Sequence, residues 1–85
     1  KEEKSLEEQL ILSFQDAIET LPPRMKQIFV RCKIMGQKQP DVADELGISI
    51  KAVEKHIATA KKHISDRLIR QFPLMSLLIF FWLES

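Results

Sequence analysis

Apolar residues recur at helical spacing in the first part of the chain. Successive members are three or four positions apart, as one face of a helix requires. They are Leu6, Leu10, Phe14, Ile18 and Leu21. Ser5 precedes this run and is followed three positions later by Glu8, in the S-x-x-E form of a capping box. The pattern predicts a first helix over about Ser5 to Thr20.

A proline pair then interrupts the helical pattern. Pro22 and Pro23 cannot continue a helix, but proline suits a first helical position. We therefore expect a second helix over about Pro23 to Met35, ending at Gly36. Its expected core residues are Met25, Ile28, Phe29 and Cys32.

The middle of the chain predicts a short helix, a turn and a long helix. The short helix covers about Pro40 to Leu46, and Gly47 ends it. Ser49 is placed to cap a fourth helix, which can continue to about Arg70 because no residue before Pro73 breaks it. The inward residues of the short helix are Val42, Ala43 and Leu46, and Ile48 packs in the turn.

The predicted fourth helix has one apolar face and one basic face, at 100° per residue. The apolar face consists of Val53, Ile57, Ala60 and Ile64. The opposite face consists of Lys51, Lys55, Ala58 and Lys62, with Thr59 beside them. Glu54 and Lys61 lie on one flank, and His56 and His63 on the other. Lysines separated by small residues suit a helix that lies in the major groove of DNA.

These elements together predict an all-α fold, a small helical bundle that contains a helix-turn-helix. Ala43 is small enough for a close crossing of two helices. Gly47 can take the left-handed conformation that the turn requires, and Val53 can pack into the angle between the helices. The alternative from the residues alone is an ordinary helical hairpin with a solvated basic face.

Length and charge agree with one small DNA-binding domain. The chain has 85 residues and a net charge of +1. Residues 1–20 sum to −4, whereas residues 21–70 sum to +6, and a basic segment of this kind favours a polyanionic partner. The first residue is Lys1 rather than methionine, so we also expect a longer parent protein.

The composition argues against enzymes, metal sites and secreted proteins. The single cysteine, Cys32, allows no internal disulfide and suits a reduced, cytoplasmic protein. His56 and His63 are seven residues apart, about 10 Å along a helix, which is too far for one metal ion. No nucleophile motif or glycine-rich phosphate loop is present. We therefore expect no catalytic residues, cofactor or small-molecule substrate, and no secretory signal is visible.

The segment Leu74–Leu83 is apolar at nine of its ten positions. It is too short to cross a bilayer as a helix, which takes about 20 residues. Four interpretations stay open: a last helix that closes the core, a protein-binding surface that includes self-association, contact with a membrane surface, and β pairing over Leu78–Leu83. We expect residues 1–70 to form the helix-turn-helix domain and residues 71–85 an apolar tail.

Three stretches resemble a known family. They are "LPPRMKQIFV", "VADELGIS" and "KAVEKHIATAKK", in this order over about Leu21 to Leu68. They are similar to region 4 of bacterial sigma factors of the sigma-70 family, especially the extracytoplasmic-function group. The resemblance implies a region that binds the −35 element of double-stranded promoter DNA and docks the β-flap of RNA polymerase core. An anti-sigma factor is a further partner that the family suggests.

The resemblance also implies a set of DNA-binding residues. The base-reading stretch maps to Ser49–His56, with Lys51, Lys55 and His56 as the main contacts. Arg24 and Lys38 match positions that contact phosphates. The complete expected set is Arg24, Lys38, Ser49, Lys51, Glu54, Lys55, His56, Thr59 and Lys62, with Gly47 in the turn.

Two positions depart from the family pattern. Pro40 replaces a residue with a free amide, and Glu54 stands where many members carry a basic residue. Glu54 could accept a hydrogen bond from a cytosine amine or pair with Lys51 or Lys61. Two other function classes stay open at this point. One is a LuxR/NarL-type response-regulator effector domain, which shares the Val-Glu-x-His-Ile pattern, and the other is a protein-binding helical module.

Overall fold

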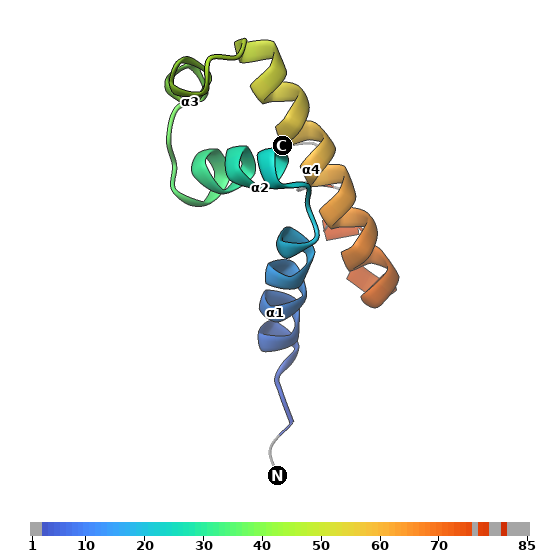
Figure 1. Cartoon of the computed structure of the whole chain (residues 1–85). Coiled ribbons are helices and arrows are strands. Elements are labelled where there is room, and N and C mark those ends of the chain that lie inside the picture. The colour runs from blue at the N-terminus through green and yellow to red at the C-terminus, as the bar shows by residue number, and fades with distance from the viewer. Residues whose placement is uncertain (1–2, 76, 79–80, 82–85) are drawn as a thin grey trace.

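The structure is a computed structural model that describes residues 3–75, 77–78 and 81. These residues form helices joined by short loops, and no strand occurs among them. The elements are α1 (Leu6–Glu19), α2 (Pro23–Phe29), the π-helical segment η1 (Val30–Ile34), α3 (Gln39–Leu46), α4 (Ile50–Gln71) and the 3-10 turn η2 (Pro73–Met75). The predicted all-α class is therefore confirmed. α4 runs along one side of the molecule, with α3 near its start, α2 beside its middle and α1 beside its second half (Figure 1).

α1 begins with the predicted capping box. Ser5 Oγ accepts the Glu8 N–H at 3.1 Å, and the Ser5 N–H donates to Glu8 Oε1 at 2.9 Å. The apolar face of α1 is only partly covered, because Ile18 is buried whereas Leu6 is 54% exposed. Leu6 lies on the predicted apolar face but outside the core, since α4 packs against the C-terminal end of α1 and not against its start.

The sequence predicted a single α-helix for the second element, but the structure divides it into α2 and η1. After Phe29 the chain widens into η1, where the Met35 N–H donates to the Val30 carbonyl five residues back, at 2.9 Å. Gly36, at φ 75°, then reverses the chain. The predicted end of this segment is confirmed, but the hydrogen-bond pattern of its second half differs.

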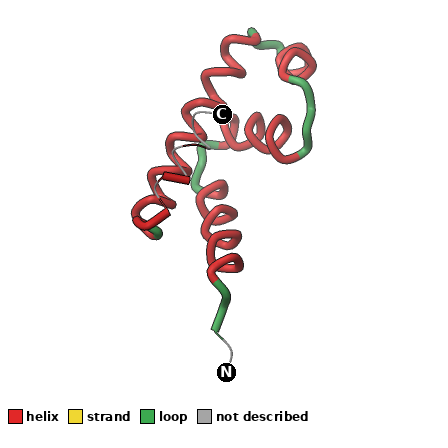
Figure 2. Tube along the Cα trace, turned by 180° about the vertical axis from the view of Figure 1, so that it is seen from behind, coloured by secondary structure: helices red, strands yellow, loops and turns green. Residues whose placement is uncertain are grey.

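Two apolar clusters hold the helices together. The first joins α1, α2 and the second half of α4 through Ala17, Ile18, Leu21, Phe29, Ala60, Ile64 and Leu68. The second joins α2, α3 and the first half of α4 through Ile28, Val42, Ala43, Val53 and Ile57. Neighbouring residues of α2 thus enter different clusters, and α4 contributes to both. Seen from behind, α4 is an unbroken helix that spans both halves of the bundle (Figure 2).

The beginning of the apolar tail lies at the far end of α4. Met75 packs against the first cluster. Leu74, Leu77, Leu78 and Phe81 are all exposed. Among the described residues of Leu74–Leu83, the core-closing interpretation therefore holds only at Met75. Most of the stretch for which β pairing was considered lies outside the described residues.

Candidate nucleic-acid interface

A three-residue turn joins α3 to α4. Its first residue, Gly47, has a φ of 68°, in the left-handed region that favours glycine. The Ile48 N–H donates to the Ala43 carbonyl at 3.0 Å, and the Gly47 N–H donates to the Asp44 carbonyl at 3.2 Å. This Schellman arrangement satisfies the last carbonyls of α3 and fixes the direction in which the chain leaves it. α3, the turn and α4 form a helix-turn-helix.

Ser49 starts α4 with a side-chain cap. Its Oγ accepts the Ala52 N–H at 3.0 Å, and its carbonyl accepts the Val53 N–H at 3.2 Å. The hydroxyl proton is not used by this cap and can be donated to an acceptor outside the protein. Ser49 therefore has a structural role in addition to any contact with a ligand.

One face of α4 carries a lysine stripe, which we define as Lys51, Lys55 and Lys62. All three side chains are exposed, as are the small residues Ala58 and Thr59 between them. The stripe extends about 16 Å along the helix axis. The opposite face of α4 is buried in the two apolar clusters. The ion pairs among the described residues all involve other side chains, so the stripe presents its charge to solvent.

The predicted DNA-binding residues come from three helices. Seven of them share α4 or its cap: Ser49, Lys51, Glu54, Lys55, His56, Thr59 and Lys62. Lys38 is exposed at the N-cap of α3, which packs on α4, and Arg24 is exposed in the first turn of α2. His56 is half-buried on the flank.

Glu54 is exposed and lines a cleft together with Lys61 and Lys62. Within the described part of the chain it forms no ion pair with Lys51 or Lys61. The pairing considered from the sequence is therefore not present, and the Glu54 carboxylate is open to solvent.

Arg31 connects η1 to α3, and sequence reasoning missed this residue. Its Nε donates to Gln37 Oε1 at 2.7 Å, and its guanidinium forms an ion pair with Glu45. The half-buried Arg31 thus ties the loop before α3 to the last turn of that helix. Glu45 is 14 residues away, so no local sequence signal connects the two side chains.

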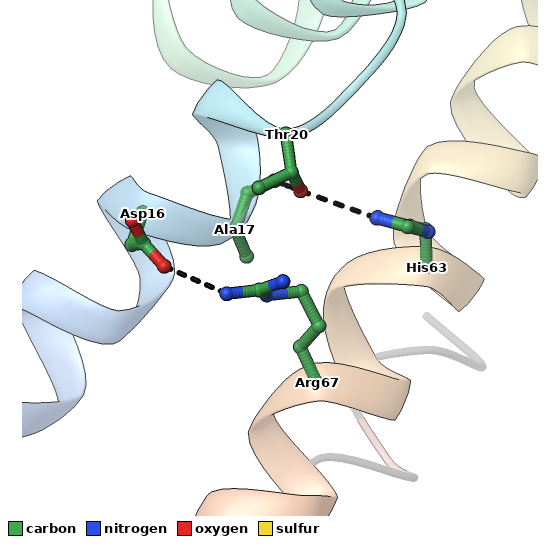
Figure 3. A network of polar contacts seen from close by, with 5 residues as sticks. All are labelled: Asp16, Ala17, Thr20, His63 and Arg67. Carbon is green, nitrogen blue, oxygen red and sulfur yellow. Dashed lines mark hydrogen bonds and ion pairs between the residues drawn. The ribbon is translucent and has the colours of Figure 1, made fainter.

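Polar contacts also join the end of α1 to α4 (Figure 3). Thr20 Oγ1 donates to the Ala17 carbonyl at 2.6 Å, which leaves its oxygen to accept from His63 Nε2 at 3.2 Å. Arg67 Nη2 lies 2.7 Å from Asp16 Oδ2. An exposed ion pair of this kind contributes at most about 1 kcal/mol to stability. These contacts orient α1 on the second half of α4.

Two titratable groups near α3 have shifted pKa values. Burial, and then the neighbouring Lys33 ammonium, lowers the pKa of Lys61, whose side chain lies within the protein despite its charge. Burial raises the pKa of the Cys32 thiol, although Arg31 and Lys33 act in the opposite direction. Cys32 packs against the second apolar cluster, as expected of a small core residue.

Comparison with known protein families gives one result. The family model described as "Sigma-70, region 4" matches residues 11–64, which is more than half of the chain. The chain belongs to this family. Searches of the curated proteins and of the solved structures find no significant match to the region 4 chain.

Membership in the region 4 family decides between the function classes that the sequence left open. Region 4 of sigma-70 proteins binds promoter DNA in transcription initiation and interacts with RNA polymerase, and it is not an enzyme family. A LuxR/NarL-type effector domain and a purely protein-binding module are not favoured. The matched span includes Gly47 and every predicted DNA-binding residue, from Arg24 to Lys62.

Two further features of this region 4 concern only the part of the chain that the structure describes. None of its helices combines the length and the apolar character needed to cross a bilayer. None of its histidine, cysteine, aspartate and glutamate side chains come together in groups of three or more that could hold a metal ion.

Proposed function

We propose that this region 4 recognises the −35 promoter element by placing the first turns of α4 in the major groove. The lysine stripe carries this proposal: it is exposed on a helix whose start is capped and whose direction is fixed by a hydrogen-bonded turn. The stripe contains only small side chains between its lysines, so the helix can approach the floor of the groove.

The exposed side chains then divide into two groups. Lys51, Lys55 and His56 contact base edges, where a lysine can donate to guanine O6 and N7. Glu54 accepts from a cytosine amine, because its carboxylate is exposed and forms no ion pair among the described residues. The remaining predicted residues position the helix on the phosphate backbone or beside the bases; they are Arg24, Lys38, Ser49, Thr59 and Lys62.

A substitution of Lys55 tests this function. We would select a preferred duplex from a random-sequence pool and compare wild type with Lys55→Ala and with Lys4→Ala, which removes an exposed lysine outside the helix-turn-helix. Loss of a base contact should weaken binding by about 1–3 kcal/mol. Lys4→Ala should bind like wild type. Equal affinities for wild type and Lys55→Ala would contradict the assignment of α4.

We propose that the β-flap of RNA polymerase docks on another face. A groove of about 880 Å³ lies between α1, η1 and the far end of α4. Its apolar lining includes Leu10, Ile11, Phe14, Val30, Ile34 and Leu68. No residue of the lysine stripe lines this groove, so DNA and polymerase can be bound at the same time. Ile11 and Ile34 are more than half exposed, which leaves apolar surface for a partner to cover.

An NMR titration with the β-flap tip tests the docking site. Amide shifts should cluster along α1 and η1, and Ile11→Asp should abolish them because it places a charge in the groove. Lys55→Ala should leave them unchanged. Shifts confined to α4 in wild type would contradict the proposed docking face.

We assign the chain to the extracytoplasmic-function group of sigma factors because its "LPPRMKQIFV" segment precedes the helix-turn-helix. In that assignment, residues 1–70 form the DNA-binding domain and residues 71–85 an apolar tail, and the protein acts in the cytoplasm on promoter DNA. An anti-sigma factor would compete for the apolar groove. Self-association would use the exposed tail residues Leu77, Leu78 and Phe81.

A further inference from the structure

A single arginine side chain is bonded near both ends of α3. Arg31 Nε donates to Gln37 Oε1 at 2.7 Å, and Gln37 lies two residues before α3 begins. The Arg31 guanidinium also forms an ion pair with Glu45, in the last turn of α3. A guanidinium suits this task, because its donors point in fixed directions and can serve two partners at once.

The π-helical turn of η1 provides another contact between Arg31 and Gln37. In an α-helix the Met35 N–H would donate to the carbonyl of Arg31, four residues back. In η1 it donates to the Val30 carbonyl instead, at 2.9 Å, and the Arg31 carbonyl accepts the Gln37 N–H at 2.9 Å. Gln37 is therefore bound to Arg31 through both its backbone and its side chain. π-helical turns are frequent at functional sites.

These contacts fix the backbone on both sides of Lys38. Gln37 precedes Lys38 and is bound to Arg31, whereas the Lys38 carbonyl accepts the Val42 N–H at 3.1 Å and so begins α3. A lysine side chain contains no acceptor atom, so Lys38 cannot cap its helix as Ser49 caps α4. The start of α3 thus depends on the loop that Arg31 holds, and the exposed Lys38 side chain leaves the protein from this point.

The Arg31 guanidinium already has two protein partners, Gln37 and Glu45. Its side chain is 20% exposed, so protein atoms cover most of it. A direct contact with DNA would need the same group to reach phosphate oxygens in addition to these partners. The geometry therefore favours an indirect role of Arg31 in DNA binding.

We infer that Arg31 is a positioning residue for DNA binding. It holds the start of α3 so that Lys38 reaches a phosphate of the DNA backbone, and it acts through Gln37 and Glu45 without touching the DNA. The inference rests on the proposed function, because it takes Lys38 to contact the backbone. It adds a residue of η1 to the groups on which DNA binding depends.

A double-mutant cycle between Arg31 and Lys38 tests the inference. Arg31→Met removes the guanidinium but keeps an unbranched side chain, and Lys38→Ala removes the proposed phosphate contact. Each single variant should weaken binding to the preferred duplex severalfold and reduce the salt slope by about one. The two losses should not add in the double variant, because Lys38 is already displaced in Arg31→Met.

The matched control is Arg70→Met, which removes an exposed arginine in the last turn of α4 and should bind like wild type. Circular dichroism identifies the temperature at which every variant is folded, and affinities are compared there. Additive losses, with a salt slope reduced by about two, would overturn the inference because Arg31 would then contact DNA itself. Wild-type affinity in Arg31→Met would also overturn it.

Glu45→Gln provides a second test that keeps Arg31 in place. The Glu45 side chain is 60% exposed, and loss of its negative charge should by itself strengthen binding to a polyanion. If Glu45 holds Arg31 in position for DNA binding, the same substitution should weaken binding instead. Stronger binding of Glu45→Gln would overturn the inference.

Lys55→Ala separates failure of the inference from failure of the proposed function. Wild-type affinity in both Lys38→Ala and Arg31→Met, with weaker binding in Lys55→Ala, would overturn the positioning role but leave α4 as the DNA-binding helix. Wild-type affinity in Lys55→Ala would contradict the proposed function itself. Weaker binding in all three single variants, without additivity between Arg31 and Lys38, is the result that we expect.

Discussion

Gly47 determines the turn of the helix-turn-helix through its backbone conformation alone. A Cβ built at this position would meet no atom within 4 Å, so a side chain there is not excluded by contacts. Its φ of 68° is nevertheless unfavourable for any residue with a Cβ. Strain of the backbone is therefore the only cost that a substitution should have.

Gly47→Val should reduce the free energy of unfolding by about 1–2 kcal/mol or more, because valine is β-branched and disfavours positive φ. Gly47→Asn should cost less, since asparagine tolerates this region best among the other residues. Urea unfolding of the two variants measures the difference. If Gly47→Val were as stable as wild type, the turn would have another conformation in solution.

Lys61 makes the stability of the fold depend on pH. Its pKa is lowered in the folded protein, so between that lowered pKa and the ordinary lysine pKa of 10.5 the unfolded chain binds more protons. The free energy of unfolding should therefore rise with pH in this window. Among the described residues, the charged side chains that line the same cleft as Lys61 are Lys33, Glu54 and Lys62.

The Lys61→Met variant should lose this rise, because it removes the titrating group but keeps an unbranched side chain of similar length. Urea unfolding of both proteins at several pH values up to 10.5 measures it. The pKa of Cys32 is raised from 9.0, so its titration lowers the free energy of unfolding as the pH rises. This contribution is the same in wild type and in Lys61→Met, and it cancels when the two pH profiles are compared. Parallel pH profiles would show that Lys61 is not buried in solution.

Whether the role of a residue could be predicted from the sequence depended on how far its contact partners lie from it along the chain. The exposure of the lysine stripe and the capping by Ser5 and Ser49 follow from positions within one helix, and the structure has them as expected. The burial of Lys61 and the role of Arg31 depend on other elements, Lys33 and Glu45 respectively. Helical periodicity carries no information about such contacts.

At the scale of elements, the first residue before α4 combines a structural role with a proposed functional role. The Ser49 hydroxyl caps the helix, and the same residue is proposed to lie against DNA. These two roles can be separated, because an aspartate also caps a helix but carries a negative charge.

Ser49→Ala should lower the free energy of unfolding by about 1 kcal/mol through loss of the cap. Ser49→Asp should keep the stability of wild type but bind DNA more weakly, since its carboxylate would repel the phosphates. Unfolding and duplex titrations on the same samples measure both effects. Unchanged DNA affinity in Ser49→Asp would place the start of α4 away from the DNA.

The helix boundaries were predictable to within a residue or so, except in the second helix. Prolines, glycines and capping residues mark the ends of α1, α3 and α4. Nothing in the composition of Val30–Ile34 separates a π-helical from an α-helical turn, because the difference lies in which carbonyl accepts the Met35 N–H.

At the scale of the whole molecule, the two ends of α4 have separate tasks. Its first half carries the lysine stripe, whereas its second half packs against α1 and η2. Lys51 and Phe72 are about 30 Å apart along the axis. The apolar tail therefore starts far from the proposed DNA contacts.

Deletion of residues 76–85 should leave DNA affinity and its salt dependence unchanged, because the lysine stripe and its supporting clusters remain. The same deletion should reduce any concentration-dependent self-association, since it removes the exposed Leu77, Leu78 and Phe81. Fluorescence anisotropy and analytical ultracentrifugation measure the two properties. Loss of DNA binding on deletion would show that the tail belongs to the interface.

The central claim is that the exposed face of α4 meets promoter DNA. An NMR titration of the chain with its preferred duplex maps that surface directly. The account predicts that the largest amide shifts fall within Ser49–Lys62 and at the start of α3, with little change at Ile11 and Ile34 in the apolar groove. Shifts concentrated along α1 and η1, or none on α4, would contradict it.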